Sequence, residues 1–171
     1  MILTGSEIAT QIAKGNIEID PFDSTVVNPN SYNYRLGSQI KEIDSQTPID
    51  TRQPFEVDAR DIAEEGIVLN PKRHYLAHTL ERIGSSKFVP FLIGRSSMGR
   101  LGLFLQISAD LGNLGVCHRW TLELMCVRPI RIYPGMRIGQ VSFWVSAGDT
   151  EPYGGQLGQF NEPKLPLHFE T

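Results

Sequence analysis

The sequence predicts a mainly β protein, an antiparallel sandwich or barrel with one short helix near its N-terminus. Two observations lead to this fold class. Short runs rich in β-branched, aromatic and leucine residues recur along the chain, and clusters of Pro, Gly, Asn and Asp separate them. Only the N-terminal segment shows the spacing of an amphipathic helix. The regular alternation of strands and helices that is typical of a parallel sheet is therefore not indicated.

The N-terminal helix is expected to begin near Thr4 or Ser6, because both side chains can accept a hydrogen bond from a backbone N–H of the first turn. Ile8 and Ile12 fall on one face of this helix. Gly15 follows and can adopt the left-handed conformation that ends helices.

The strands are expected in runs with high β propensity between turn signals. The turn signals lie at 28–31, 44–48, 70–72 and 133–135. The strand-like runs are 75–82, 88–93, 103–108, 120–127, 130–133 and 136–144. Residues 149–171 are rich in Gly, Pro and Gln and contain few residues for a core, so we expect them to form a mobile C-terminal arm.

Length and composition limit the class of protein. With 171 residues, 40% hydrophobic and 20% charged, the chain can bury one sizeable core, so 1–171 is expected to be a single domain. The net charge of −3 disfavours a nucleic-acid polymer as a partner. Neither a secretory signal nor an apolar stretch long enough for a membrane is evident, so we expect a cytoplasmic protein without a membrane partner. Cys117 and Cys126 are expected to be free thiols.

Residues 94–102 read GRSSMGRLG, a combination suited to binding an anion. Arg95 and Arg100 carry fixed charge, Ser96 and Ser97 add hydroxyl groups, and the glycines let backbone amides approach a ligand. A surface turn with solvated arginines is the alternative interpretation.

Glu123 is the candidate for proton transfer. In a strand, Glu123 shares one face with Thr121 and Met125, while Leu122 and Leu124 point to the other. Burial on this face would raise the pKa of the carboxyl group toward the useful range. A glutamate that faces water on an edge strand fits the spacing equally well.

Motifs for several other chemistries are missing from the sequence. The P-loop, the dinucleotide-binding glycine motif and the zinc deaminase signature are absent. The four histidines do not form a metal-binding spacing with the cysteines, and His78 in a strand is interpreted as a structural residue. We therefore expect no metal held by protein side chains.

The segments GRSSMGRLGLF, WTLEL and PGMRIGQVSF, in this order and spacing, resemble the dCTP deaminase family, which belongs to the trimeric dUTPase-like β-barrels. The segments MILTGSEI, NPNSYNYRLG and IVLNPKRHYLAHTLERI add to this resemblance, which reaches to about residue 145. The resemblance implies a distorted antiparallel β-barrel with a short N-terminal helix. It also implies a homotrimer whose sites lie between subunits.

The resemblance further implies zinc-independent hydrolytic deamination of a cytosine deoxynucleotide, in the first instance dCTP to dUTP and ammonia. Glu123 would shuttle protons, Ser96 and the backbone carbonyl of Ala109 would hold the attacking water, and Arg100 would stabilise the site. The triphosphate, carrying Mg²⁺, would be bound by the GRSS segment. The residues expected to bind substrate are Arg95, Ser97, Asn113, Thr121, Tyr153, Gln156 and Gln159.

The segment ADLGNLGV at 109–116 departs from the family pattern, A-H-R-I-D-P-G-W or A-G-W-I-D-x-G-F. Asn113 stands where the family aspartate contacts the sugar 3′-hydroxyl and helps to activate water for triphosphate cleavage. Because an amide cannot act as that base, we expect no dUTP pyrophosphatase activity. Val116 lacks the aromatic ring expected near the nucleoside. Two alternatives therefore stay open: a deaminase of a modified or less phosphorylated cytosine nucleotide, and a non-catalytic nucleotide-binding protein that kept the barrel.

Overall fold

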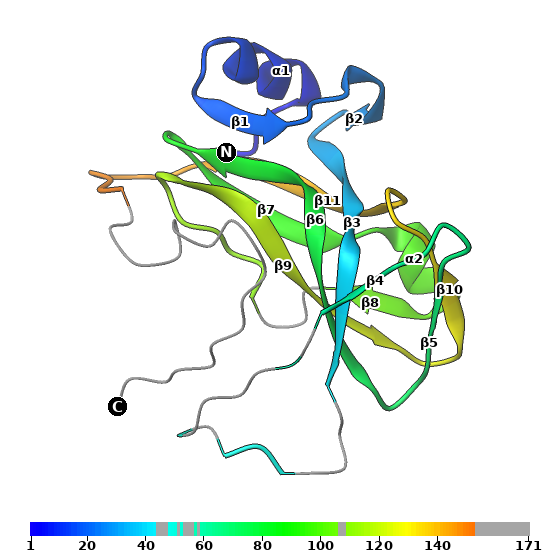
Figure 1. Cartoon of the computed structure of the whole chain (residues 1–171). Helices are drawn as coiled ribbons and strands as arrows, with labels where there is room; N and C mark the ends of the chain where they lie inside the picture. Colours follow the sequence, from blue (N-terminus) through cyan, green and yellow to red (C-terminus); the bar gives the residue numbers. More distant parts are fainter. Residues whose placement is uncertain (44–47, 51, 53–56, 58, 106–108, 153–171) are drawn as a thin grey trace.

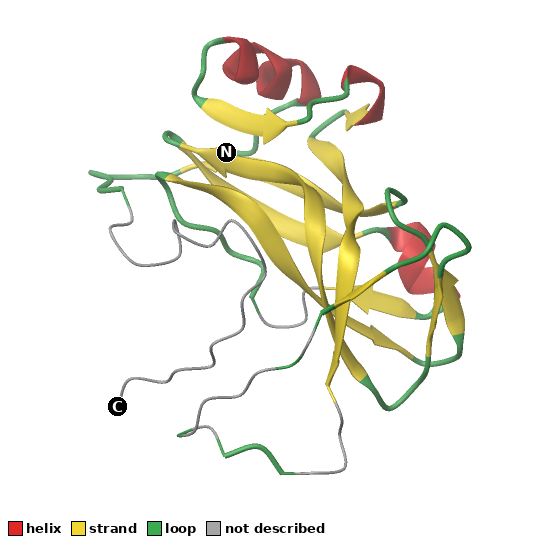
Figure 2. Ribbon diagram, viewed as in Figure 1, coloured by secondary structure: helices red, strands yellow, loops and turns green. Residues whose placement is uncertain are grey.

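Strands of the chain curve into a nearly closed antiparallel barrel, with a short helix packed at one end (Figures 1 and 2). The computed structural model describes residues 1–43, 48–50, 52, 57, 59–105 and 109–152. The elements in chain order are α1 (Gly5–Ala13), β1 (Ile17–Asp20), η1 (Ser24–Val26), β2 (Val27–Asn28), β3 (Ser31–Ile43), β4 (Arg60–Asp61), β5 (Ile67–Leu69), β6 (His74–Ser85), β7 (Phe88–Gly94), α2 (Ser96–Leu101), β8 (Leu103–Leu105), β9 (Val116–Cys126), β10 (Ile130–Ile132) and β11 (Arg137–Val145).

Helix α1 forms where the sequence predicts it. The Thr4 side chain accepts a hydrogen bond from the backbone N–H of Glu7 at 3.3 Å. Ile8 is fully buried in the core, and Gly15, with φ of 72°, follows the helix in the left-handed region. The predicted amphipathic helix is therefore confirmed.

All six predicted strand runs contain strands, and the largest omission is β3. β9 begins four residues before the predicted run, and residues 106–108 of another run lie outside the described residues. β3 is buried on both faces for most of its length, since it pairs with β11 on one side and β6 on the other. Continuous burial removes the alternation of polar and apolar residues that identifies a strand in a sequence.

The main sheet has nine strands, and its central path runs β7-β11-β3-β6-β9-β8. β7 and β8, at the two ends of this path, are consecutive in the sequence and are joined by α2. Residues 110–112 also pair with β7, because Leu92 N–H donates to the carbonyl of Asp110 and Gly112 N–H donates to that of Pro90, both at 2.8 Å. These connections bring the first and last strands of the path together.

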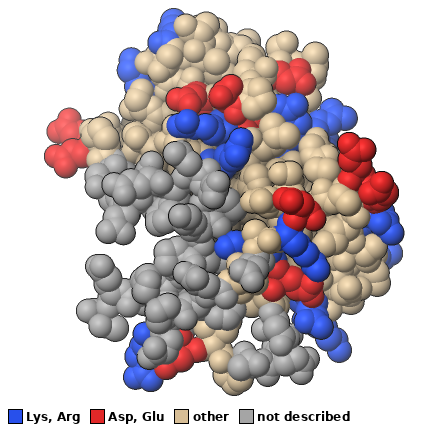
Figure 3. Space-filling view, viewed as in Figure 1, with Lys and Arg blue, Asp and Glu red and all other residues tan. Residues whose placement is uncertain are grey.

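The core is made of apolar side chains from the inner faces of the strands. Its largest fully buried members include Tyr32, Tyr34, Leu36, Tyr75, Leu92, Leu122 and Phe143. Outside, acidic and basic side chains are interspersed over the visible face (Figure 3). Among the described residues, no helix combines the length and the apolar composition needed to cross a membrane.

One ion pair is buried between β3 and β6. Glu81 has no exposed side-chain surface, and its carboxylate accepts hydrogen bonds from Arg35 N–H at 2.9 Å and from Arg35 Nε at 2.7 Å. Arg35 Nη2 also donates to the carbonyl of Pro21 at 3.2 Å. The pair thus ties the two strands together with charge-assisted hydrogen bonds.

Candidate functional site

A pocket of about 230 Å³ lies beside the first half of β9. Its lining residues are Ala109, Leu111, Gly112, Asn113, Val116, His118, Trp120 and Thr121. Three of the residues predicted from the sequence, Ala109, Asn113 and Thr121, therefore meet around one cavity. A pocket that combines apolar walls with a few polar groups is typical of small-molecule sites.

The segment before β9 is held close to the pocket by backbone contacts with β7. Gly112 lies against the Trp120 ring, where an added Cβ would come within 2.2 Å of that ring and within 2.7 Å of Pro90. Only glycine fits this position without displacing its neighbours.

Two stacked rings form one wall of the pocket. The rings of His118 and Trp120 lie 4.6 Å apart with an interplanar angle of 26°. Trp120 is anchored by its Nε1, which donates to the carbonyl of Ile83 at 2.9 Å. His118 Nδ1 is 2.9 Å from the carbonyl oxygen of Arg119. Because a carbonyl only accepts, Nδ1 carries the proton in this hydrogen bond.

These rings were missed by the sequence interpretation. Val116 lacks the aromatic ring that the family resemblance leads one to expect, and the structure shows aromatic rings two and four positions further along the strand. The alternation of β9 is the signal that could have found them, since positions 116, 118 and 120 fall on one face. Burial, as the largest cause, lowers the pKa of His118, and the charge of Arg82 lowers it further, although the bond to Arg119 opposes this.

Glu123 lies further along β9, on the same strand face as Thr121, as the alternation predicts. Glu123 is paired with Leu76 of β6, and Thr121 with His78. β9 lies between β6 and β8, so Glu123 is not on an edge strand, and it is half-buried rather than fully exposed. Two residues of strand separate the backbones of Thr121 and Glu123 by about 7 Å.

The predicted anion-binding residues lie around α2. The stretch, for which a surface turn was the alternative interpretation, contains a helix of six residues that begins after Arg95 and ends before Gly102, which has φ of 89°. Ser96, Ser97 and Arg100 are exposed on it. Arg95 Nη1 donates to the carbonyl of Arg137 at 3.1 Å, while Nε of Arg95 is buried without a hydrogen-bond partner among the described residues.

Within one chain, α2 and the pocket lie toward opposite ends of β9. The carbonyl of Gly102, at the end of α2, accepts a hydrogen bond from Val127 N–H at 3.0 Å, just beyond the end of β9. Six residues of extended chain, about 20 Å, separate Thr121 from Val127. The single chain therefore gathers Ala109, Asn113 and Thr121, whereas the α2 residues form a second group. Tyr153, Gln156 and Gln159 lie outside the described residues.

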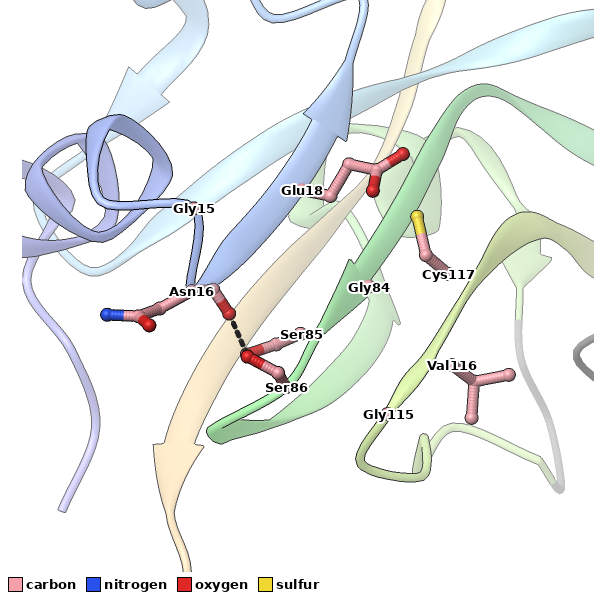
Figure 4. A pocket seen from close by; sticks show the side chains of 9 residues that line it. All are labelled: Gly15, Asn16, Glu18, Gly84, Ser85, Ser86, Gly115, Val116 and Cys117. Carbon is pink, nitrogen blue, oxygen red and sulfur yellow. Dashed lines mark hydrogen bonds between the residues drawn. The ribbon is translucent and has the colours of Figure 1, made fainter. Parts of the chain in front are cut away.

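A second pocket, of about 180 Å³, lies where β1 and β6 meet the start of β9 (Figure 4). The hydroxyl of Ser85 donates to the carbonyl of Asn16 at 2.7 Å and accepts two backbone N–H groups. Burial and the neighbouring carboxylate of Glu18 raise the pKa of Cys117 to about 12. This thiol is therefore a poor nucleophile at neutral pH.

Both cysteines are free, as predicted. His78 is buried and its Nδ1 is 2.9 Å from the carbonyl of Thr79, which agrees with a structural role. In the ranges that the structure describes, no group of three or more His, Cys, Asp or Glu side chains could hold a metal ion.

Comparisons with known proteins agree on one family. The model of the dCTP deaminase-like family matches residues 2–146. The "dCTP deaminase, dUMP-forming" of Clostridium acetobutylicum is 43% identical over 166 residues, which are 97% of this chain and 95% of that protein. The protein of the same name from Cytophaga hutchinsonii is 41% identical over the same shares of each chain.

The fold also agrees with a solved structure. The 2′-deoxycytidine 5′-triphosphate deaminase from Agrobacterium tumefaciens superimposes with a TM-score of 0.67 and 22% identity. The superposition covers 85% of this chain and 48% of that one, so this chain spans about half the length of the solved chain. The predicted antiparallel barrel with a short N-terminal helix is confirmed.

Proposed function

Because the chain belongs to the dCTP deaminase-like family, we propose that it is a hydrolase that deaminates dCTP. One observation of the structure supports this proposal most directly. The pocket gathers Ala109, Asn113 and Thr121, and Glu123 follows two residues later on the same strand face as Thr121. A pocket of this size, with apolar walls and a few polar groups, suits a pyrimidine base.

In the proposed reaction, water adds to C4 of cytosine and the 4-amino group leaves as ammonia. Glu123 takes a proton from the attacking water and delivers it to N3, and then takes the proton of the new C4 hydroxyl group and delivers it to the amino group as the C4–N bond breaks. The backbone carbonyl of Ala109 and the hydroxyl of Ser96 orient the water, and Arg100 stabilises the charged intermediate. No zinc is required, since the carboxylate performs both proton transfers.

The phosphates would be bound by the α2 group, Arg95, Ser96, Ser97 and Arg100, contributed by a neighbouring subunit of a homotrimer. The separation of α2 from the pocket along β9 supports this arrangement. The α2 group offers hydroxyl and guanidinium donors, which suit phosphate oxygens and not a divalent cation. Mg²⁺ would accordingly be held by the triphosphate and would neutralise part of its charge.

The product differs from our expectation. The two relatives are named for forming dUMP, which favours dUMP over dUTP as the end product here. We therefore propose that a second water molecule attacks the α-phosphorus while the nucleotide is still bound, that the bond between the α-phosphorus and the bridging oxygen breaks and pyrophosphate leaves, and that the proton of this water goes to solvent. Asn113 can orient a water molecule by hydrogen bonds but cannot accept its proton as an aspartate would. That free dUTP is not cleaved stays a prediction.

The test is ammonia release from dCTP with Mg²⁺ by the purified protein. Glu123→Gln, which keeps the shape of the side chain, is expected to lower the rate by at least about 10⁴-fold, since one group serves as both base and acid. Glu42→Gln is the matched control, because Glu42 lies on β3 in an exposed ion pair with Arg60. Melting temperatures of both variants should remain within a few degrees of the wild type.

The same assay decides between the alternatives. Ammonia from dCMP, dCDP or a 5-substituted dCTP at a higher kcat/KM than from dCTP would change the assigned substrate. Nucleotide binding without ammonia from any of these compounds would instead identify a non-catalytic binding protein.

The product is determined in parallel by separating dUMP from dUTP and by measuring pyrophosphate. Dominant dUTP would contradict the proposed end product. Asn113→Asp introduces a carboxylate at the position in question and is expected to increase pyrophosphate release without a matching increase in ammonia.

A further inference from the structure

We propose that Tyr34 is a positioning residue, whose hydroxyl fixes the end of β7 and thereby the start of α2, the helix that carries Ser96 and Ser97. This inference rests on the proposed function, since it assumes that α2 binds the phosphates of the nucleotide. It assigns a role to a tyrosine that lies in the core and acts only through the backbone of β7.

The side chain of Tyr34 starts on β3 and crosses β11 to reach β7. Its hydroxyl donates to the carbonyl of Ile93 at 3.1 Å. Tyr34 pairs with Gly139 of β11, and Gly139 pairs in turn with Gly94 of β7. The three positions therefore form one row across three neighbouring strands, and a single side chain links the first strand of this row to the third.

The crossing depends on the missing side chain of Gly139. A Cβ atom at this position would overlap the hydroxyl oxygen and the Cζ atom of Tyr34. The tyrosine fills the space and has no exposed surface. Burial, and then the charge of Glu81, raises the pKa of Tyr34, so the hydroxyl keeps its proton at neutral pH. The bond to Ile93 is therefore retained under assay conditions.

This bond lies directly before α2. Only Gly94 separates Ile93 from Arg95, after which the helix begins. The Arg95 side chain does not cap the helix, because its Nη1 donates to the carbonyl of Arg137 on β11 at 3.1 Å. The start of α2 is thus held by two contacts with neighbouring strands, one through Tyr34 and one through Arg95.

The start of α2 matters because hydrogen bonds to a phosphate require donors at defined distances. A helix of six residues has little stability of its own, so its position depends on its attachments. Its end is attached separately, through the bond between Gly102 and Val127. Loss of the Tyr34 hydroxyl should therefore loosen the part of α2 that carries Ser96 and Ser97 and leave the rest of the barrel intact.

The experiment measures the binding of inorganic tripolyphosphate with Mg²⁺, which tests the phosphate site without a base or a sugar. Tyr34→Phe keeps the ring and removes the hydroxyl. In calorimetry its Kd for tripolyphosphate should be about three- to tenfold higher than that of the wild type, which is the range for one hydrogen bond. Hydrogen exchange of the amides of residues 95–101 should be faster in this variant.

Tyr32→Phe is the matched control. Tyr32 lies on the same strand and is also fully buried, but its hydroxyl accepts the N–H of Asp23 at 3.3 Å. This variant should leave the Kd within about twofold of the wild type, and both variants should lower the melting temperature by only a few degrees. An unchanged Kd in Tyr34→Phe, or an equal rise in Tyr32→Phe, would show that Tyr34 supports the fold only and would overturn the inference.

Gly139→Ala tests the crossing itself. The added methyl group must displace the Tyr34 ring, so the Kd for tripolyphosphate should rise at least as much as in Tyr34→Phe. In a Tyr34→Val background, where no ring crosses β11, Gly139→Ala should raise the Kd by less than about twofold. Equal effects of Gly139→Ala in the two backgrounds would contradict the proposed link between these residues.

The inference and the proposed function can fail separately. Absence of ammonia from dCTP with the wild type refutes the proposed function, whereas the Kd values for tripolyphosphate still decide on Tyr34. A wild type that does not bind tripolyphosphate would overturn the inference, whether or not ammonia is formed.

Discussion

The buried ion pair between Arg35 and Glu81 allows a stability effect to be worked out from the structure. Glu81→Ala removes two acceptors at once, one for the backbone N–H of Arg35 at 2.9 Å and one for its Nε at 2.7 Å. A charge-assisted hydrogen bond contributes about 1.5–3 kcal/mol and a neutral donor about 0.5–1.5 kcal/mol. The expected loss in the free energy of unfolding is therefore about 3 kcal/mol, within the range for breaking a buried pair.

This loss corresponds to a decrease in melting temperature of about 6–12 °C for a domain of this size. Glu81→Gln retains one oxygen as an acceptor, so a loss of about 1–2 kcal/mol is expected. Because the Arg35 side chain is 24% accessible, water can replace some of its lost contacts. The expected loss of unfolding free energy for Glu81→Ala is therefore below the upper limit for breaking a buried ion pair.

Urea denaturation is the assay, with all variants at one protein concentration because the proposed subunit association would also stabilise the folded state. Glu42→Ala is a matched control. Glu42 pairs with Arg60 at the same 2.7 Å distance, but both side chains are partly exposed, so its removal should cost less than about 1 kcal/mol. Equal losses of unfolding free energy for Glu81→Ala and Glu42→Ala would refute the reasoning that burial makes the Arg35–Glu81 pair contribute more to stability than the Glu42–Arg60 pair.

Three other outcomes follow from the pocket and its surroundings. Cys117, with a pKa of about 12, should react with iodoacetamide at neutral pH only after unfolding, and mass spectrometry showing rapid labelling of the folded protein would contradict its burial beside Glu18. Burial lowers the folded-state pKa of His118 below its usual value of 6.5, so the unfolded state takes up a proton first as the pH falls. The contribution of neutral His118 to stability should therefore be present above about pH 6.5 and decrease below it. Urea midpoints that depend on pH to the same extent in His118→Phe and in the wild type would argue against this. Gly112→Ala should displace the Trp120 ring, lower stability by about 1–3 kcal/mol and weaken dCTP binding in calorimetry, whereas unchanged values would show that the ring can move freely.

Much of the fold could be predicted because local patterns and tertiary structure agree. The cap at Thr4, the buried Ile8 and the strand runs all carry their own signals. β3 did not, since it is buried on both faces and its tyrosines and asparagine do not alternate as polar and apolar. No helix was predicted at α2, where a surface turn was the alternative to an anion-binding stretch; Gly102 lies at the helix end, where φ of 89° suits glycine.

The site was predictable only in part, for a related reason. Alternation along β9 correctly placed Glu123 with Thr121, because strand geometry is local. The wall made by His118 and Trp120 depends on how residues 110–112 return to β7, which no local pattern encodes. The proposed meeting of α2 with Glu123 would require the placement of a neighbouring subunit, which no single-chain pattern encodes. The roles of these residues in catalysis therefore stay predictions.

β9 is attached to β6 in two separate stretches. The pairing shifts between His78 and Arg82 on β6, opposite Thr121 and Arg119 on β9. At this break the hydroxyl of Thr79 accepts the N–H of Trp120 at 2.9 Å and takes the place of a regular ladder bond. Substitutions in residues 116–119 of β9 can thus change the shape of the pocket, whereas residues 121–124 keep their separate pairing with β6. The pairing that holds Glu123 opposite Leu76 is therefore separate from the pairing that holds His118 opposite Ile83.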